Sequence, residues 1–136
     1  MSRPEFKARL ILEATIAPSE DPAKVAAALG NVAGEEAKGV SIGSVSARFV
    51  TEDPRAIDRV RDQLRDRHVR SAARRQLMIN RTGHSASMML NRQAAAAGVV
   101  ALCSSPEESP LGPIYLTIAS DELDAVIDWL TAYAEG

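Results

Sequence analysis

The sequence predicts an α+β fold: an antiparallel sheet with helices packed on one face, in the order β-α-β-α-α-β-β-β-α. Three observations lead to this fold class. Several stretches alternate apolar and polar residues as strands do, others carry apolar residues at helical spacing, and the connections between the later strands are short. Short connections favour antiparallel pairing, because parallel neighbours need a longer crossover. A length of 136 residues fits a single domain, 1–136.

The first half of the chain predicts two strands with a helix between them. Residues 6–17 alternate as a strand does. Asp21 followed by Pro22 is typical of a helix start, with the carboxylate as N-cap and proline at the first helical position. Residues 40–50 predict a second strand, in which Gly43 is a weak point or a bulge.

The middle of the chain predicts two consecutive helices. The apolar stripe of the first, continued at 100° per residue, would bury His68 and Arg75. A second stripe fits the later residues, but it is rotated around the helix axis. We therefore expect helices at 54–66 and 69–79, with a break at 66–68.

The last third predicts the remaining strands and a closing helix. Residues 88–91, 99–103 and 114–119 are expected strands, and 93–97 fits either a helical turn or the sheet. Ser120 is expected to cap the final helix, whose acidic first turn suits the positive end of the helix dipole.

The net charge of −2 conceals a strong segregation of charge along the chain. Residues 55–92 contain ten arginines and three aspartates, for a net charge of +7. Residues 93–136 contain seven acidic residues and no lysine or arginine, for −7. Such an asymmetry indicates an electrostatic partner, either outside the chain or within it.

Two interpretations of the basic stretch remain open. A phosphate-binding surface needs several arginines on one face, each of which releases a counterion. Alternatively, the arginines meet the acidic last third, within one subunit or across a dimer. The pI near 5.7 and an aromatic content of 4% disfavour RNA, since base stacking needs rings. The candidate phosphate contacts are Arg70, Arg74, Arg75, Arg81 and Arg92.

A second candidate is the polar motif of Asn91 and Gln93 on either side of Arg92. Such amides can bind a ligand phosphate or read a base edge. They can equally satisfy backbone groups where a strand becomes a turn, with the arginine paired to an acid. Glu20, beside the helix cap, is expected to face solvent.

The sequence indicates no catalytic residue, metal site or cofactor, and we expect no enzyme. His68, His84 and Cys103 fit no metal-ligand spacing, and no titratable pair falls in a catalytic motif. The lone cysteine fits a reducing cytoplasm. No apolar run approaches a membrane span, and the N-terminus is not typical of a signal peptide, so we expect a cytoplasmic protein without membrane contact.

Three stretches together resemble a known family. They are APSEDPAKVAAAL at 17–29, LNRQAAAAGVV at 90–100 and PLGPIYLTI at 110–118. Their order and spacing resemble the archaeal uncharacterised protein family 0201, and the resemblance covers nearly the whole chain. Arg92 stands where that family usually has lysine, and Ala96 stands where an aromatic is common.

The resemblance implies a fold similar to RNA-binding modules, notably the ribosomal protein that binds 5S ribosomal RNA. Two hypotheses follow. The chain is either a weak RNA-binding module that uses its arginines, or a homodimeric protein-interaction module whose basic and acidic segments pair with each other and which does not bind nucleic acid.

Overall fold

A single antiparallel sheet is the centre of the structure, a computed structural model that describes residues 7–34, 39–66 and 68–131. The strand order is β2-β3-β1-β5-β4, so β1 lies in the middle, paired with β3 and β5. The short β2 and the longer β4 form the two edges. The strands are β1 (Arg9–Thr15), β2 (Ser41–Ile42), β3 (Ser46–Thr51), β4 (Ser85–Leu90) and β5 (Ile114–Ala119).

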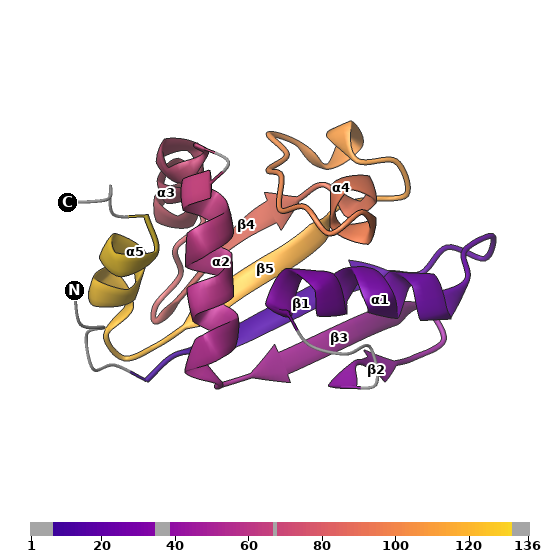
Figure 1. Cartoon of the computed structure of the whole chain (residues 1–136), viewed down its shortest axis with the longest axis horizontal. Coiled ribbons are helices and arrows are strands. Elements are labelled where there is room, and N and C mark those ends of the chain that lie inside the picture. The colour runs from indigo at the N-terminus through magenta and orange to yellow at the C-terminus, as the bar shows by residue number, and fades with distance from the viewer. Residues whose placement is uncertain (1–6, 35–38, 67, 132–136) are drawn as a thin grey trace.

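The α-helices all lie on one face of this sheet (Figure 1). They are α1 (Pro22–Ala33), α2 (Pro54–Asp66), α3 (Arg70–Ile79), the short α4 (Arg92–Ala96) and α5 (Leu123–Thr131), with a 3-10 turn η2 at Pro106–Glu108. The described residues leave the opposite face of the sheet uncovered. None of the helices in the described ranges is long and apolar enough to cross a membrane.

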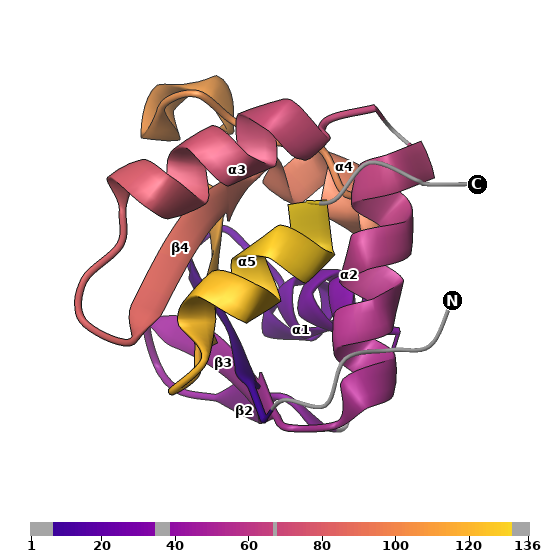
Figure 2. The same ribbon diagram turned by 90° about the vertical axis from the view of Figure 1, so that its left-hand side faces the viewer.

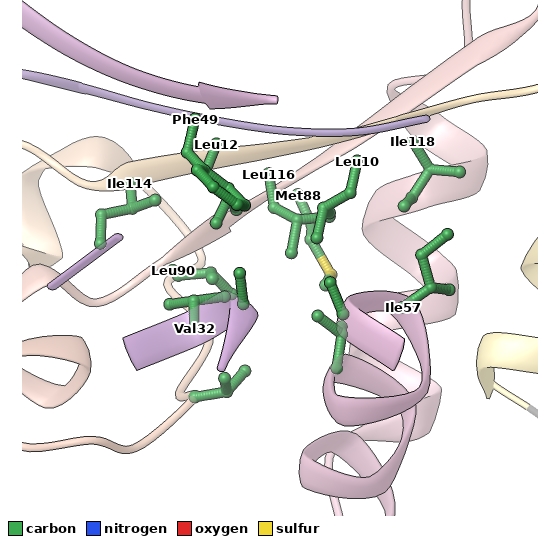
Figure 3. Close-up of a cluster of buried hydrophobic side chains, with 14 of the residues drawn as sticks. Leu10, Leu12, Val32, Phe49, Ile57, Met88, Leu90, Ile114, Leu116 and Ile118 are labelled. Atoms are coloured by element: carbon green, nitrogen blue, oxygen red, sulfur yellow. The ribbon is translucent and has the colours of Figure 1, made fainter. Parts of the chain in front are cut away.

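The core lies between the sheet and the helices. Leu10 and Leu12 of β1 and Leu116 of β5 point from the sheet toward Val32 of α1 and Ile57 of α2 (Figure 3). All five are essentially inaccessible to solvent, and each contributes about 1.5–3 kcal/mol by its burial. The alternation of buried and exposed residues along β1 explains why the sheet has one apolar face.

The predicted break between the two middle helices is confirmed. His68 adopts a left-handed backbone conformation with φ of 57°, which a continuous helix cannot contain. Val69 N donates to Leu64 O, which closes the end of α2 before α3 begins. The break lets each helix turn its own apolar stripe to the core.

Two predicted strands differ from the structure. Residues 40–50 are two strands, because Gly43 N donates to Ser46 O and the chain reverses there. The predicted strand at 99–103 is wrong, since the segment makes only an isolated bridge between Leu102 and Leu90. Residues 93–96 of the ambiguous 93–97 stretch belong to α4, Ala97 is its C-cap, and Gly98 follows with a positive φ of 84°.

Candidate functional site

The five candidate arginines do not form one patch. Arg70, Arg74 and Arg75 belong to α3, and Arg81 lies in the turn after it. Arg92 begins α4 and is 4% exposed, so it offers almost no surface to a ligand. The five arginines together therefore do not form the shared, outward-facing basic surface that the sequence suggested.

Two of these arginines are bound by the acidic helix α5, which packs beside α3 (Figure 2). Arg74 Nη1 donates to Asp128 Oδ1 at 2.7 Å and also reaches the Thr131 hydroxyl at 3.3 Å. Arg81 donates to Asp124, one helical turn before Asp128. The hydrogen bond and the charge of Arg81 lower the pKa of the Asp124 carboxyl below its ordinary value.

Other arginines of the basic stretch also contact the chain itself. Arg61 Nε donates to Trp129 O at 2.9 Å, and its guanidinium lies 4.6 Å from the centre of the Trp129 ring. Arg59 Nε donates to Asn31 O. Arg75 is exposed and makes no ion pair with any residue in the described ranges. The basic stretch is thus largely occupied by contacts inside one subunit.

Arg92 and Glu20 form the most buried ion pair in the described part of the chain. Arg92 Nη1 lies 2.7 and 2.8 Å from the two carboxylate oxygens of Glu20. Arg92 Nε donates to Gly112 O at 3.0 Å, and Nη2 donates to the Thr15 hydroxyl at 3.3 Å. These contacts use most of the donors of the guanidinium.

The prediction that Glu20 faces solvent is wrong, because its side chain is 12% exposed. Burial on its own raises the pKa of Glu20. The Ala17 amide, which donates to the carboxylate at 2.8 Å, and the Arg92 guanidinium outweigh burial and hold that pKa below its ordinary value. Asp21 is the N-cap as predicted, since its carboxylate accepts from Ala23 N.

The polar motif beside Arg92 is engaged with the backbone. Asn91 Oδ1 accepts from Ala94 N at 2.9 Å and caps α4. Gln93 Nε2 donates to Pro110 O at 3.0 Å, and its Oε1 accepts from the Ser109 hydroxyl. Of the two roles that the sequence allows, the amides perform the structural one in this geometry.

A cavity of about 330 Å³ lies between α1 and α4, above the Glu20–Arg92 pair. Its charged lining consists of Glu20, Asp21, Lys24 and Arg92, two of each sign, and it includes no histidine or cysteine. Both carboxylates are engaged, Glu20 by Arg92 and Asp21 by the Ala23 amide. The cavity therefore presents neither a free nucleophile nor an excess of one charge.

Metal and thiol chemistry find no support in the described ranges. No three histidine, cysteine, aspartate or glutamate side chains in those ranges are grouped so that they would hold a metal ion. Cys103 is buried, and burial, with a further contribution from the charge of Glu108, raises the pKa of its thiol. A thiol in that environment stays protonated near neutral pH.

Sequence reasoning missed Gln76, which connects three segments. Its Oε1 accepts from Met89 N at 2.8 Å, and its Nε2 donates to Cys103 O at 2.6 Å. Gln76 thus joins α3 to the outer edge of β4 and to the 99–103 segment. Its position on α3 carried no signal of this role, because glutamine is an ordinary helix residue.

Comparison with known proteins places these features in a family. No family model matches the sequence. A UPF0201 protein of Sulfurisphaera tokodaii is 35% identical over 125 residues, covering 90% of this chain and 86% of its own length. One from Methanopyrus kandleri is 35% identical over 133 residues, covering 90% and 83%. The crystal structure of a UPF0201 protein from Methanococcus jannaschii superimposes with a TM-score of 0.74, at 22% identity, over 94% of this chain and 96% of that one.

Proposed function

We infer that this chain, which belongs to the UPF0201 family, is a non-catalytic protein-interaction module that acts as a homodimer in the cytoplasm and does not bind nucleic acid. One observation carries this conclusion: two of the four arginines of α3 and its following turn are bound by α5 of the same subunit, through Arg74–Asp128 and Arg81–Asp124.

This pairing removes the main source of affinity for nucleic acid. A free arginine gains affinity for nucleic acid by neutralising a phosphate and releasing the small cations condensed around it. At Arg74 and Arg81 the phosphate would instead have to displace Asp128 and Asp124, whose charges repel it within a Debye length of roughly 8–10 Å. Arg92 is buried against Glu20, and the exposed Arg75 by itself supplies far fewer cations than the several that a phosphate-binding surface needs.

Support for a non-catalytic role comes from the titratable groups that the structure describes. The Glu20 carboxylate is held ionised by Arg92, so it is a poor proton donor. The Cys103 thiol is buried and has a raised pKa, so it is a poor nucleophile. Neither group lies in a convergent acid–base or nucleophile–base pair.

The pairing can be tested by removing the acids. A wild-type protein incubated with labelled single-stranded and hairpin RNA at 20 mM and 200 mM salt is expected to show no retention in a filter assay. The double variant Asp124→Asn/Asp128→Asn frees Arg74 and Arg81, and we expect it to acquire weak retention that disappears at 200 mM salt. Salt-sensitive retention indicates phosphate contacts.

The matched control is Asp121→Asn/Glu122→Gln, which changes the net charge equally in the turn that leads into α5. Neither residue is ion-paired with an arginine in the described ranges, so no retention is expected. Wild-type retention at 20 mM salt that is lost in Arg70→Glu/Arg74→Glu/Arg81→Glu would establish the RNA-binding hypothesis instead. Sedimentation equilibrium tests the dimer, and a monomer mass at every concentration up to 500 μM would contradict it.

A further inference from the structure

We propose that the uncovered face of the sheet is the surface on which a second copy of this chain docks, about a two-fold axis. This inference rests on the homodimer of the proposed function and identifies the surface that forms it. The open sheet face is defined by the outward-pointing residues of four strands, Arg9, Ile11, Glu13, Arg48, Val50, Ser87, Met89, Tyr115 and Thr117.

The register places these side chains in two rows across the sheet. Ile11 lies between Val50 of β3 and Thr117 of β5. Glu13 lies between Arg48 and Tyr115. Val50 is 43% exposed and Tyr115 is 42% exposed, although both are in regular strands. An apolar centre of this kind, with an aromatic residue that has a polar tip, is typical of protein interfaces.

The second row ends on Met89 of β4, which lies directly opposite Tyr115. Met89 is half-buried, so its flexible thioether side chain remains accessible beside the Tyr115 ring. Methionine adapts its shape to a partner surface and contacts aromatic rings favourably. The apolar centre therefore extends from β3 across β1 and β5 to β4.

The charges on this face favour a second copy of the chain as the molecule that binds there. Glu13 lies 3.8 Å from Arg48, and at the rim Arg9 lies 3.3 Å from Glu52. With Glu52 counted at its rim, the face carries two arginines and two glutamates. In a two-fold interface the same patch meets itself, so a patch with both signs can pair with its own copy while a patch of one sign would repel it. A neutral face gives a phosphate backbone no electrostatic attraction.

The edges of the sheet are less available for association. The outer edge of β4 is occupied, because Met89 N donates to Gln76 and Met89 O accepts from Cys103 N. Ser87 O accepts from the Asn80 side chain, and Ser85 exchanges two backbone hydrogen bonds with Thr82. The opposite edge, β2, is only two residues long. Protected edges of this kind prevent strand addition and leave the face as the association surface.

The size of the face predicts a modest affinity. Four strands about 4.8 Å apart, each about six residues long at about 3.3 Å per residue, give a flat footprint of roughly 400 Å². A standard interface buries about 800 Å² of accessible surface per partner, so this contact belongs at the small end of the range. We expect a dissociation constant in the micromolar range.

Sedimentation equilibrium of the full chain between 5 and 500 μM tests the surface. Val50→Glu/Tyr115→Glu puts two carboxylates into the centre of the face, and we expect it to raise the dimer dissociation constant at least ten-fold. The matched control is Met78→Glu/Ile79→Glu on α3, where the side chains are 47% and 73% exposed. We expect the control to dimerise as the wild type does. Circular dichroism checks that every variant is folded.

A charge-reversal series gives a second test that does not depend on the apolar centre. Glu13→Arg leaves three arginines against Glu52 alone and should weaken the dimer, while Glu13→Arg/Arg48→Glu restores two groups of each sign and should recover it. A dimer that survives all sheet variants but is lost in the α3 control would overturn the surface and leave the homodimer intact. A wild type that is monomeric throughout would overturn the proposed function itself.

Discussion

Glu20 and Arg92 are 72 positions apart in the chain, yet both carboxylate oxygens of Glu20 lie within 2.8 Å of Arg92 Nη1 in an almost fully buried ion pair. Arg92 also donates to Gly112 O. The pair therefore joins the 17–29, 90–100 and 110–118 stretches, the same three that carry the family resemblance. Their polar residues have a shared physical role, which is to hold α1, α4 and the start of β5 together.

Breaking this pair from one side should destabilise the fold strongly. Glu20→Gln leaves the Arg92 charge buried without a counterion, and Arg92→Met leaves the Glu20 carboxylate in the same position. We expect each single variant to lose about 3–5 kcal/mol of unfolding free energy. Urea denaturation followed by circular dichroism provides the measurement.

The control is the double variant Glu20→Leu/Arg92→Met, which removes both charges and should lose less than the sum of the two single variants. Single variants that each lose less than about 1 kcal/mol would show that the pair contributes no more than an exposed ion pair does.

The stability of the fold should fall with acid through Glu20. Its pKa in the folded protein lies below the ordinary value of 4.5. The stabilising contribution is therefore fully present above the pKa of the unfolded chain and is lost as pH falls through the folded pKa. Urea midpoints measured from pH 7 to pH 3 should decline below about pH 4.5 in the wild type.

Glu20→Gln provides the comparison, since it cannot titrate at this position. Asp53 and Asp124 also have lowered pKa values in the folded state, and they contribute equally to both proteins. The wild-type decline should thus be the steeper of the two. Parallel declines would mean that Glu20 adds nothing to the acid sensitivity.

High salt should leave the dimer intact. The sequence alone suggested that basic and acidic segments build the interface, and such a dimer would dissociate when salt screens its charges. Because Arg74 and Arg81 pair within the subunit, we instead expect contacts of Ile11, Val50 and Tyr115 to hold the copies together. Sedimentation at 50 mM and 1 M sodium chloride should give the same mass, and dissociation at 1 M would support a charge-built interface.

Gln76 should protect the β4 edge. Gln76→Ala removes the acceptor of the Met89 amide and the donor to Cys103 O. An unsatisfied amide at a partly buried site costs about 1–3 kcal/mol, and the exposed edge becomes available for strand pairing. We expect faster hydrogen exchange at the Met89 amide, measured by nuclear magnetic resonance, and more aggregation on heating.

Arg75→Ala, one position earlier on α3, is the control for this variant. Its side chain is exposed and makes no ion pair with any residue between 7 and 131 that the structure describes, so stability and exchange should match the wild type. Equal exchange rates in all three proteins would show that the Met89 amide is protected by something other than Gln76.

The local structure of this protein follows from patterns that can be recognised along the chain. The Asp21–Pro22 signal begins α1, the change of apolar stripe places the break at His68, and β5 begins and ends where its alternation does. These features depend on neighbouring residues, whose backbone preferences and spacing are readable along the chain. The antiparallel α+β class follows from the same patterns.

Which distant groups contact each other depends on how the elements pack in three dimensions. Arg74 pairs with Asp128, which is 54 positions later in the chain, and Arg81 pairs with Asp124, which is 43 positions later. No pattern of local residue spacing predicts contacts over such separations. The 99–103 segment has a strand-like sequence, but Gln76 takes the hydrogen bonds that a continued ladder would use. An apolar or charged pattern indicates that a face of a helix or strand contacts other groups. The packing of distant elements determines which groups those are. The phosphate role of the five arginines stays a prediction.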